Sequence, residues 1–173
     1  MWFGEPTLEA VQELHEQLRV RGEQLALAES CTGGLLGAAI TAVGGSSDVF
    51  DLGMVTYSNA AKIELLGVPS QTIDHTGAVS GPTARAMAVG VRDQLDEIDW
   101  AISITGLAGP AGGRPGKPVG TVYIGVATSV NSGEQSFARR YRFDGNRDSI
   151  RIQTVKAAID LAIDTIDQSP KPS

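Results

Sequence analysis

The sequence is poor in the side chains that form disulfides and zinc sites. It holds one cysteine, Cys31, and two histidines in 173 residues. One cysteine excludes an internal disulfide, and three such side chains are too few to indicate a zinc site. We therefore expect no metal and no other cofactor. Because free cysteines are among the most buried residue types, we also expect Cys31 to be a buried structural thiol.

Long apolar stretches and basic charge are scarce as well. No run approaches the roughly 18 apolar residues of a membrane span, and residues 1–6 lack the basic and then apolar pattern of a signal peptide. Asp and Glu outnumber Lys and Arg by 20 to 14, which gives a formal net charge of −6. Because binding to nucleic acid needs clustered cations, we expect a cytoplasmic protein that binds neither membranes nor nucleic acids.

The composition is that of a folded chain. Hydrophobic residues make up 42% of the sequence, and a chain of this length can bury the core of one domain. We expect a single domain over residues 1–168, followed by a flexible tail over residues 169–173. Symmetric dimers are the commonest assembly of such domains, so we expect a homo-oligomer, with a dimer as its form.

Apolar periodicity predicts helices and strands that mostly alternate along the chain. The run Trp100–Thr105 is apolar almost throughout, which is typical of a central strand covered on both faces. Residues 71–79 are expected to form a connection, and the Gly-rich residues 106–120 a loop. The expected helices cover residues 7–22, 33–43, 59–66, 80–95 and 148–166, and the expected strands 24–28, 50–57, 100–105, 121–128 and 135–143, with a hairpin at Ser132-Gly133. This order predicts an α/β fold, a three-layer α/β/α sandwich with a mixed central sheet.

Two of these helices carry an apolar stripe, which predicts the face that is buried. In the helix over residues 80–95, Ser80 is the expected N-cap. The stripes consist of Ala84, Met87, Ala88, Val91 and Leu95 in that helix, and of Ile152, Val155, Ile159, Ile163 and Ile166 in the last one.

The segment AESCTGG, residues 28–34, follows a strand and opens a helix. Ligands of open α/β sheets bind at the carboxyl ends of strands. The free N–H groups at the start of a helix can hold an oxyanion or a phosphate. Ser30 is therefore a candidate nucleophile. The alternative is that Ser30 or Thr32 only caps the helix, which is the commoner position of these residue types.

A second strand-to-helix junction, TYSNAAK at residues 56–62, should lie on the same edge of the sheet. A neutral lysine can act as the base for a serine. This requires the pKa of Lys62 to fall from about 10.4 toward 7 or 8, a cost to the ammonium of roughly 3–5 kcal/mol. Tyr57 could hydrogen-bond between Ser30 and Lys62. The alternative is a solvated surface lysine, and spacing alone does not show that the two groups meet.

Two further junctions carry residues suited to hold a ligand. Thr105, Gly106, Ala108 and Gly109 open the Gly-rich loop, where glycines admit close approach of the backbone, although surface loops are often rich in glycine. Arg147 and Arg151 lie one helical turn apart after another strand, and two such guanidinium groups could grip a phosphate. The alternative is that Arg147 only pairs with a neighbouring carboxylate.

In this order, the four junctions resemble the C-terminal domain of the CinA family. The matching segments span nearly the whole chain and are AESCTGG (28–34), GGSSDVFDLGMVTYSNAAK (44–62), LLGV (65–68), GAVS (77–80), SITGLAGP (103–110), KPVGTVYIG (117–125) and FDGNRDSIR (143–151). Larger CinA proteins also carry an N-terminal domain of a molybdopterin-binding-like type, so the resemblance is to the stand-alone form. That form hydrolyses the carboxamide of nicotinamide mononucleotide to nicotinic acid mononucleotide and ammonia, in pyridine nucleotide salvage.

The resemblance implies a small nucleotide substrate, with Ser30 as nucleophile, Lys62 as general base and Tyr57 as their partner. It implies substrate contacts from Thr32, Gly33, Gly34, Thr105, Gly106, Ala108 and Gly109, and from Arg147 near the phosphate. Two alternatives stay open: a catalytically silent nucleotide-binding or regulatory module, and a different amidase or esterase that uses the same serine.

Overall fold

The protein folds around one mixed β-sheet of five strands. The computed structural model describes residues 3–129 and 135–170, and its strand order is β2-β1-β3-β4-β5. The strands are β1 (Leu25–Glu29), β2 (Phe50–Val55), β3 (Trp100–Gly106), β4 (Thr121–Thr128) and β5 (Gln135–Arg142). β1 is parallel to β2 and β3, whereas β4 is antiparallel to β3 and β5. Consequently β1, β2, β3 and β5 all end at the same edge of the sheet.

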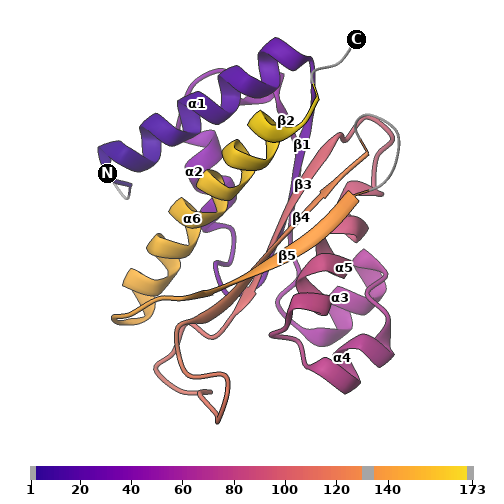
Figure 1. Cartoon of the computed structure of the whole chain (residues 1–173), viewed down its shortest axis with the longest axis vertical. Coiled ribbons are helices and arrows are strands. Elements are labelled where there is room, and N and C mark those ends of the chain that lie inside the picture. Colours follow the sequence, from indigo (N-terminus) through magenta and orange to yellow (C-terminus); the bar gives the residue numbers. More distant parts are fainter. Residues whose placement is uncertain (1–2, 130–134, 171–173) are drawn as a thin grey trace.

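Helices cover both faces of this sheet (Figure 1). One face carries α1 (Glu5–Arg21), α2 (Leu35–Thr41) and α6 (Arg147–Gln168), and the other carries α3 (Asn59–Leu66), α4 (Ser70–Thr76) and α5 (Gly81–Arg92). A short 3₁₀ turn, Ser46–Asp48, precedes β2. The predicted three-layer α/β/α sandwich with a mixed sheet is confirmed.

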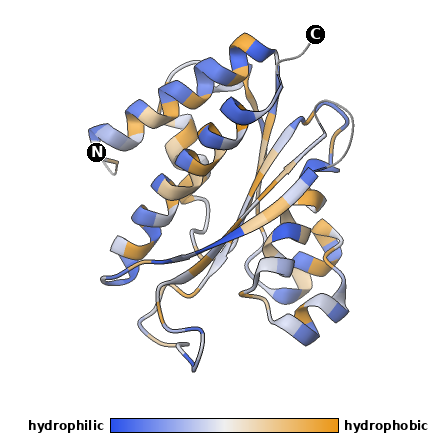
Figure 2. Cartoon of the chain, viewed as in Figure 1, coloured by the Kyte–Doolittle hydropathy of each residue, from blue (hydrophilic) through white to orange (hydrophobic). Residues whose placement is uncertain are grey.

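The two faces of the sheet carry side chains of different size. Successive side chains of a strand point to opposite faces, so Leu27 of β1 packs in the core under α1 and α6, whereas Ala28 packs in the core under α5. Figure 2 shows the apolar central strands, with hydrophilic residues on the outer surface of the helices. Small residues let α5 approach closely. At Gly125 of β4 a Cβ would lie 2.5 Å from the carbonyl oxygen of Ala84.

Several predicted element boundaries are wrong. Residues 71–79 were expected to be a connection, but α4 occupies Ser70–Thr76, and only Ile73 of this helix is buried, so no apolar periodicity signals it. The helix expected from Gly33 begins two residues later, because Gly33 and Gly34 have φ of +59° and +94°, outside the helical region.

Each predicted apolar stripe contains one residue that is exposed instead of buried. Leu95 is 46% exposed, because α5 ends at Arg92, before the stripe does. Ile152 is 41% exposed, and the buried face of α6 begins with Ile150 instead. Periodicity alone cannot distinguish neighbouring helix faces when isoleucines lie on both.

The chain end is partly held in place. Arg21 Nη2 donates to Ser169 Oγ at 2.7 Å and to the Pro170 carbonyl oxygen at 2.8 Å. The remainder of the predicted tail, residues 171–173, and the predicted hairpin at Ser132-Gly133 lie outside the described residues.

A buried histidine makes the stability of this fold depend on pH. His15 of α1 is 2% exposed, and neither ring nitrogen has a hydrogen-bond partner among the described residues. Burial, and then the charge of Arg19, lower the pKa of His15 below its usual 6.5, against a smaller opposing effect of Asp48. Below pH 6.5 the unfolded chain therefore takes up a proton that the folded chain resists, and the free energy of unfolding falls as the pH falls.

We expect His15→Leu to flatten this dependence. Guanidinium unfolding of the wild type and the variant at pH 7.5 and pH 5.5 measures it. His75→Gln, which removes the exposed histidine of α4, is the matched control and should keep the wild-type trend. Equal loss of stability on acidification in wild type and His15→Leu would contradict the assignment.

Candidate active site

The ends of β1 and β2 form the crevice in which the candidate site lies. The chain leaves β1 toward α2 on one face of the sheet and leaves β2 toward α3 on the other face (Figure 1). Such a switch in direction opens a crevice at the carboxyl ends of the strands, where open α/β sheets bind ligands. The Gly-rich loop after β3 hangs from the same edge.

Ser30 and Lys62 meet in this crevice. Lys62 Nζ lies 3.0 Å from Ser30 Oγ, although the residues are 32 positions apart. Lys62 is 1% exposed and Ser30 is 8% exposed, so the contact is shielded from solvent. The predicted proximity of the two groups is therefore present, at the distance that proton transfer from a nucleophile to a base requires.

Within the part of the chain that the structure describes, the other partners of the Lys62 amine are two backbone carbonyls. Nζ donates to the carbonyl oxygens of Thr56 at 2.7 Å and Tyr57 at 3.2 Å. Carbonyl oxygens only accept, so a neutral amine that donates both of its hydrogens to them directs its lone pair toward the Ser30 hydroxyl. Burial lowers the pKa of Lys62 and so favours this neutral form.

The Tyr57 side chain differs from expectation. It is 61% exposed, and its hydroxyl accepts from Arg147 Nη2 at 3.1 Å instead of bridging Ser30 and Lys62. The reason is that the two-residue alternation of β2 continues past its last residue, Val55, and turns Val55 and Tyr57 outward and Thr56 inward. Tyr57 thus reaches the lysine only through its backbone carbonyl.

The start of α2 is occupied by a carboxylate that sequence reasoning missed. Glu29, 2% exposed, accepts hydrogen bonds from the backbone N–H groups of Gly34 at 3.0 Å, Leu36 at 3.1 Å and Gly37 at 2.8 Å. An acidic residue at the end of the strand that leads into the helix was the available signal. These N–H groups therefore hold the loop that carries Ser30, and they do not face a substrate oxyanion.

Gly106 offers a backbone N–H on the side of β3 that faces β1 and Ser30. The carbonyl of Ile104 accepts from the Ser30 N–H at 3.0 Å, and Leu107 N–H donates to Thr121 on β4 at 2.9 Å. Because backbone groups alternate in direction along a strand, the N–H of Gly106 faces the β1 side, next to Ser30. A Cβ at this position would lie 2.7 Å from Val122 Cγ2, so the close packing here favours glycine.

A pocket of about 190 Å³ opens onto the Ser30–Lys62 pair. Of the residues predicted to act or to bind, it is lined by Ser30, Tyr57, Lys62, Thr105 and Gly106. Its other lining residues, which sequence reasoning missed, are Cys31, Asn59, Ala78 and Val79. The predicted residues outside its lining are Thr32, Gly33, Gly34, Ala108, Gly109 and Arg147.

Two of the missed residues reach the pocket from across the sheet. Ala78 and Val79 lie between α4 and α5, in the GAVS segment that the family resemblance includes, and Thr105 Oγ1 holds this segment by donating to the Ala78 carbonyl at 2.7 Å. Cys31 is 7% exposed, and burial raises the pKa of its thiol to about 11. The predicted buried thiol is confirmed, and a thiol that stays protonated is a poor nucleophile.

The two arginines at the start of α6 hold loop backbone. Arg147 Nη1 donates to the Gly109 carbonyl at 2.6 Å while Nη2 binds the Tyr57 hydroxyl, and Arg151 Nη2 donates to the Thr32 carbonyl at 2.7 Å. Among the described residues, no carboxylate pairs with Arg147. Arg147 therefore joins the loops after β2 and β3 at the mouth of the pocket.

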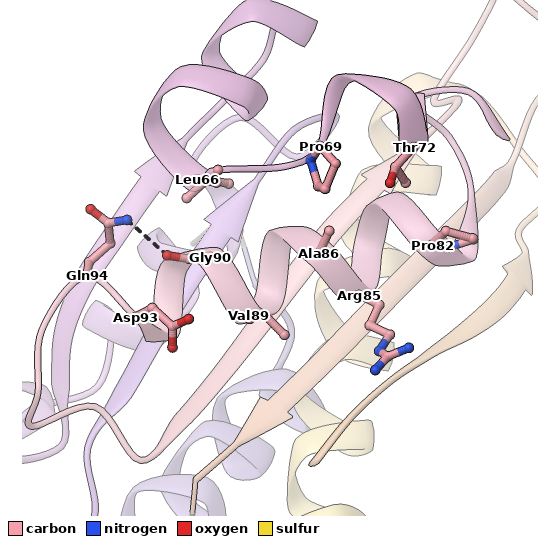
Figure 3. A pocket seen from close by; sticks show the side chains of 11 residues that line it. Leu66, Pro69, Thr72, Pro82, Arg85, Ala86, Val89, Gly90, Asp93 and Gln94 are labelled. Carbon is pink, nitrogen blue, oxygen red and sulfur yellow. Dashed lines mark hydrogen bonds between the residues drawn. The ribbon is translucent and has the colours of Figure 1, made fainter. Parts of the chain in front are cut away.

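A wider groove of about 640 Å³ lies elsewhere, along α5 (Figure 3). Its two ionisable side chains, Arg85 and Asp93, lie toward opposite ends, and Leu66, Pro69 and Val89 lie between them. It holds no nucleophile beside a base, so the smaller pocket is the better candidate for chemistry.

Residues 3–129 and 135–170 hold neither a metal-binding cluster nor a membrane-spanning helix. These residues contain no cluster of three or more His, Cys, Asp or Glu side chains placed to hold a metal ion. Their helices are too short or too polar to cross a membrane.

Known sequences similar to this chain all point to one family. A family model described as the CinA C-terminal domain matches residues 8–166. A CinA-like protein of Anaeromyxobacter sp. (strain K) is 48% identical over 159 residues, which cover 92% of this chain and 38% of that protein. A putative competence-damage inducible protein of Caldanaerobacter subterraneus is 51% identical over 144 residues, covering 83% of this chain and 34% of that protein. The chain thus spans a little over a third of the length of such relatives.

Solved structures agree over nearly the whole chain. A competence/damage inducible protein from Agrobacterium tumefaciens superposes with a TM-score of 0.89 at 36% identity, covering 96% of this chain and 98% of that one. A competence damage-inducible protein A from Klebsiella pneumoniae gives a TM-score of 0.88 at 33% identity, with coverage of 95% and 99%.

Proposed function

The chain belongs to the CinA family, whose C-terminal domain it matches, and we propose from this membership that it hydrolyses the carboxamide of nicotinamide mononucleotide to nicotinic acid mononucleotide and ammonia. The observation that carries the proposal is the buried contact of 3.0 Å between Lys62 Nζ and Ser30 Oγ, with two carbonyls as the other partners of the amine. A serine activated by a neutral lysine suits acyl transfer.

The reaction begins with proton transfer from the Ser30 hydroxyl to the Lys62 amine. Ser30 Oγ forms a bond to the carboxamide carbon, and the negative charge moves to the carbonyl oxygen. The N–H of Gly106 is positioned to donate to that oxyanion. The Lys62 ammonium then returns its proton to the amide nitrogen, the C–N bond breaks, and ammonia leaves an acyl ester on Ser30.

Water completes the cycle through the same groups. Neutral Lys62 takes a proton from water, hydroxide attacks the ester carbon, and the bond to Ser30 Oγ breaks as Lys62 returns the proton to the serine. No step requires the Tyr57 hydroxyl, whose bond to Arg147 instead fixes the wall of the pocket. Within this proposal the protein acts in the cytoplasm, as a homodimer, in pyridine nucleotide salvage.

The test is hydrolysis of a panel of substrates by the purified chain, followed as ammonia release for amides and as acid release for esters. We expect turnover of nicotinamide mononucleotide and much slower turnover of free nicotinamide and of simple esters. Turnover of esters or other amides in its place would favour a different amidase or esterase. Binding of the nucleotide without any release of ammonia would indicate a silent nucleotide-binding module and reject the proposal.

A further inference from the structure

A second cavity adjoins the pocket at Ser30. Its volume is about 470 Å³, and it shares Asn59, Ala78 and Val79 with the pocket of about 190 Å³. Ligand sites of proteins commonly occupy about 300–1,000 Å³, so the smaller pocket alone suits a ring but not a whole nucleotide. The rest of a nucleotide bound with its carboxamide at Ser30 can continue into the second cavity.

Three cations lie close to one another beside the second cavity, and one of them lines it. Arg114 lines it, and its Nη2 is 3.0 Å from the place where a Cβ on Gly77 would stand, with Lys117 Nζ 3.6 Å from the same point. Lys117 Nζ donates to the Thr76 carbonyl at 2.8 Å, and Arg140 Nη2 donates to the Gly116 carbonyl at 2.7 Å. Arg114, Lys117 and Arg140 thus come together from the Gly-rich loop and β5.

The three cations form no ion pair with any described residue. None of the seven ion pairs in the described part of the chain includes Arg114, Lys117 or Arg140. Partial burial, followed by the charges of Arg114 and Arg140, lowers the pKa of Lys117, so the cations repel one another. A bound anion would relieve this repulsion.

We infer that Arg114, Lys117 and Arg140 form a subsite for the phosphate of the nucleotide substrate, an inference that rests on the proposed function. Arg147, the cation that the family resemblance places near the phosphate, binds Gly109 and Tyr57 at the start of α6, whereas Arg114 lines the second cavity. Asp74 also lines the second cavity, and its carboxylate suits the ribose hydroxyls between the ring and the phosphate.

Kinetics of Arg114→Gln and Arg140→Gln test the subsite. Both side chains are exposed, so the variants should fold. We expect KM for nicotinamide mononucleotide to rise roughly tenfold to hundredfold with kcat little changed, since charged hydrogen bonds to a phosphate are lost. With nicotinamide riboside, which has no phosphate, the variants should match the wild type. Arg139→Gln, which removes the neighbouring cation over the Phe137 ring, is the matched control.

Calorimetry separates this inference from the proposed function. The product nicotinic acid mononucleotide and its riboside are titrated into wild type, Arg114→Gln, Arg140→Gln and Arg147→Gln. The subsite is supported if wild type binds the mononucleotide more tightly than the riboside and only Arg114→Gln and Arg140→Gln lose this preference. The same binding result without any ammonia release would reject the amidase activity and leave the subsite supported. Equal binding of the two ligands to wild type, or loss of the preference only in Arg147→Gln, overturns the subsite.

Discussion

We expect Ser30→Ala to lower kcat for ammonia release from nicotinamide mononucleotide by roughly a thousandfold or more, as loss of a nucleophile does in other acyl-transfer enzymes. The variant loses only the hydroxyl that receives the Lys62 contact at 3.0 Å, so the pocket keeps its shape and the substrate its binding site. Binding of the nucleotide should therefore remain close to that of the wild type. A stopped ammonia assay and calorimetric titration measure the two quantities.

The neighbouring thiol provides the competing nucleophile for this test. Cys31 lines the same pocket, but burial raises the pKa of its thiol to about 11, so it is protonated at neutral pH. We expect Cys31→Ala to retain turnover of the same order as the wild type. Mass spectrometry of wild type quenched during turnover should show the acyl group on Ser30. Normal turnover in Ser30→Ala, or an acyl group on Cys31, would reject the mechanism.

The layers of this fold were predictable because each long element carries its own apolar signal. The sheet centre at Trp100–Thr105 follows from its apolar composition, and the end of the helix at residues 59–66 follows from Gly67, which caps it. The helix α4 does not, since Ile73 is its only buried residue and its stability comes from packing against α5. Where tertiary contacts rather than local pattern hold an element, the sequence contains little to detect.

The candidate site was predictable to the same extent. Ser30 and Lys62 each follow a strand, and strands that end on one edge bring such residues together. The direction of the Tyr57 side chain depends on strand parity at β2, and Val79 reaches the pocket from a segment distant in sequence. The sequence therefore indicates which junctions meet, whereas the side chains that complete the pocket follow from the packing of α4 and α5.

The polar groups around the site mainly fix loops, which leaves Lys62 as the candidate general base. Glu29 holds the start of α2, and Arg147 joins the loops after β2 and β3. Neither contacts the Lys62 amine, which has no carboxylate partner among the described residues. A lysine buried without a counter-ion is held in its neutral form at a cost to folding.

Lys62→Met removes the base and should lower kcat/KM by roughly a hundredfold to ten-thousandfold, the usual contribution of a general base. In the wild type kcat/KM should fall on acidification as Lys62 becomes protonated, at a pKa below the usual 10.5 of lysine. The residual activity of the variant should lack this acid limb. A pH profile of kcat/KM for both proteins measures the difference, and an acid limb that survives in Lys62→Met would assign it to another group.

The same substitution should change how stability depends on pH. Between the lowered pKa of folded Lys62 and its usual 10.5, the unfolded chain binds a proton that the folded chain does not, so the stability of the wild type gains with rising pH. The free energy of unfolding of the wild type, minus that of Lys62→Met, should rise from pH 7 to pH 10 by at most about 1.4 kcal/mol per unit. Groups common to both proteins cancel in this difference. Lys156→Met, which removes a half-exposed lysine paired with Asp160, should show no such rise. A difference independent of pH would mean that Lys62 is an ordinary ammonium in the folded protein, and this result would reject Lys62 as the general base.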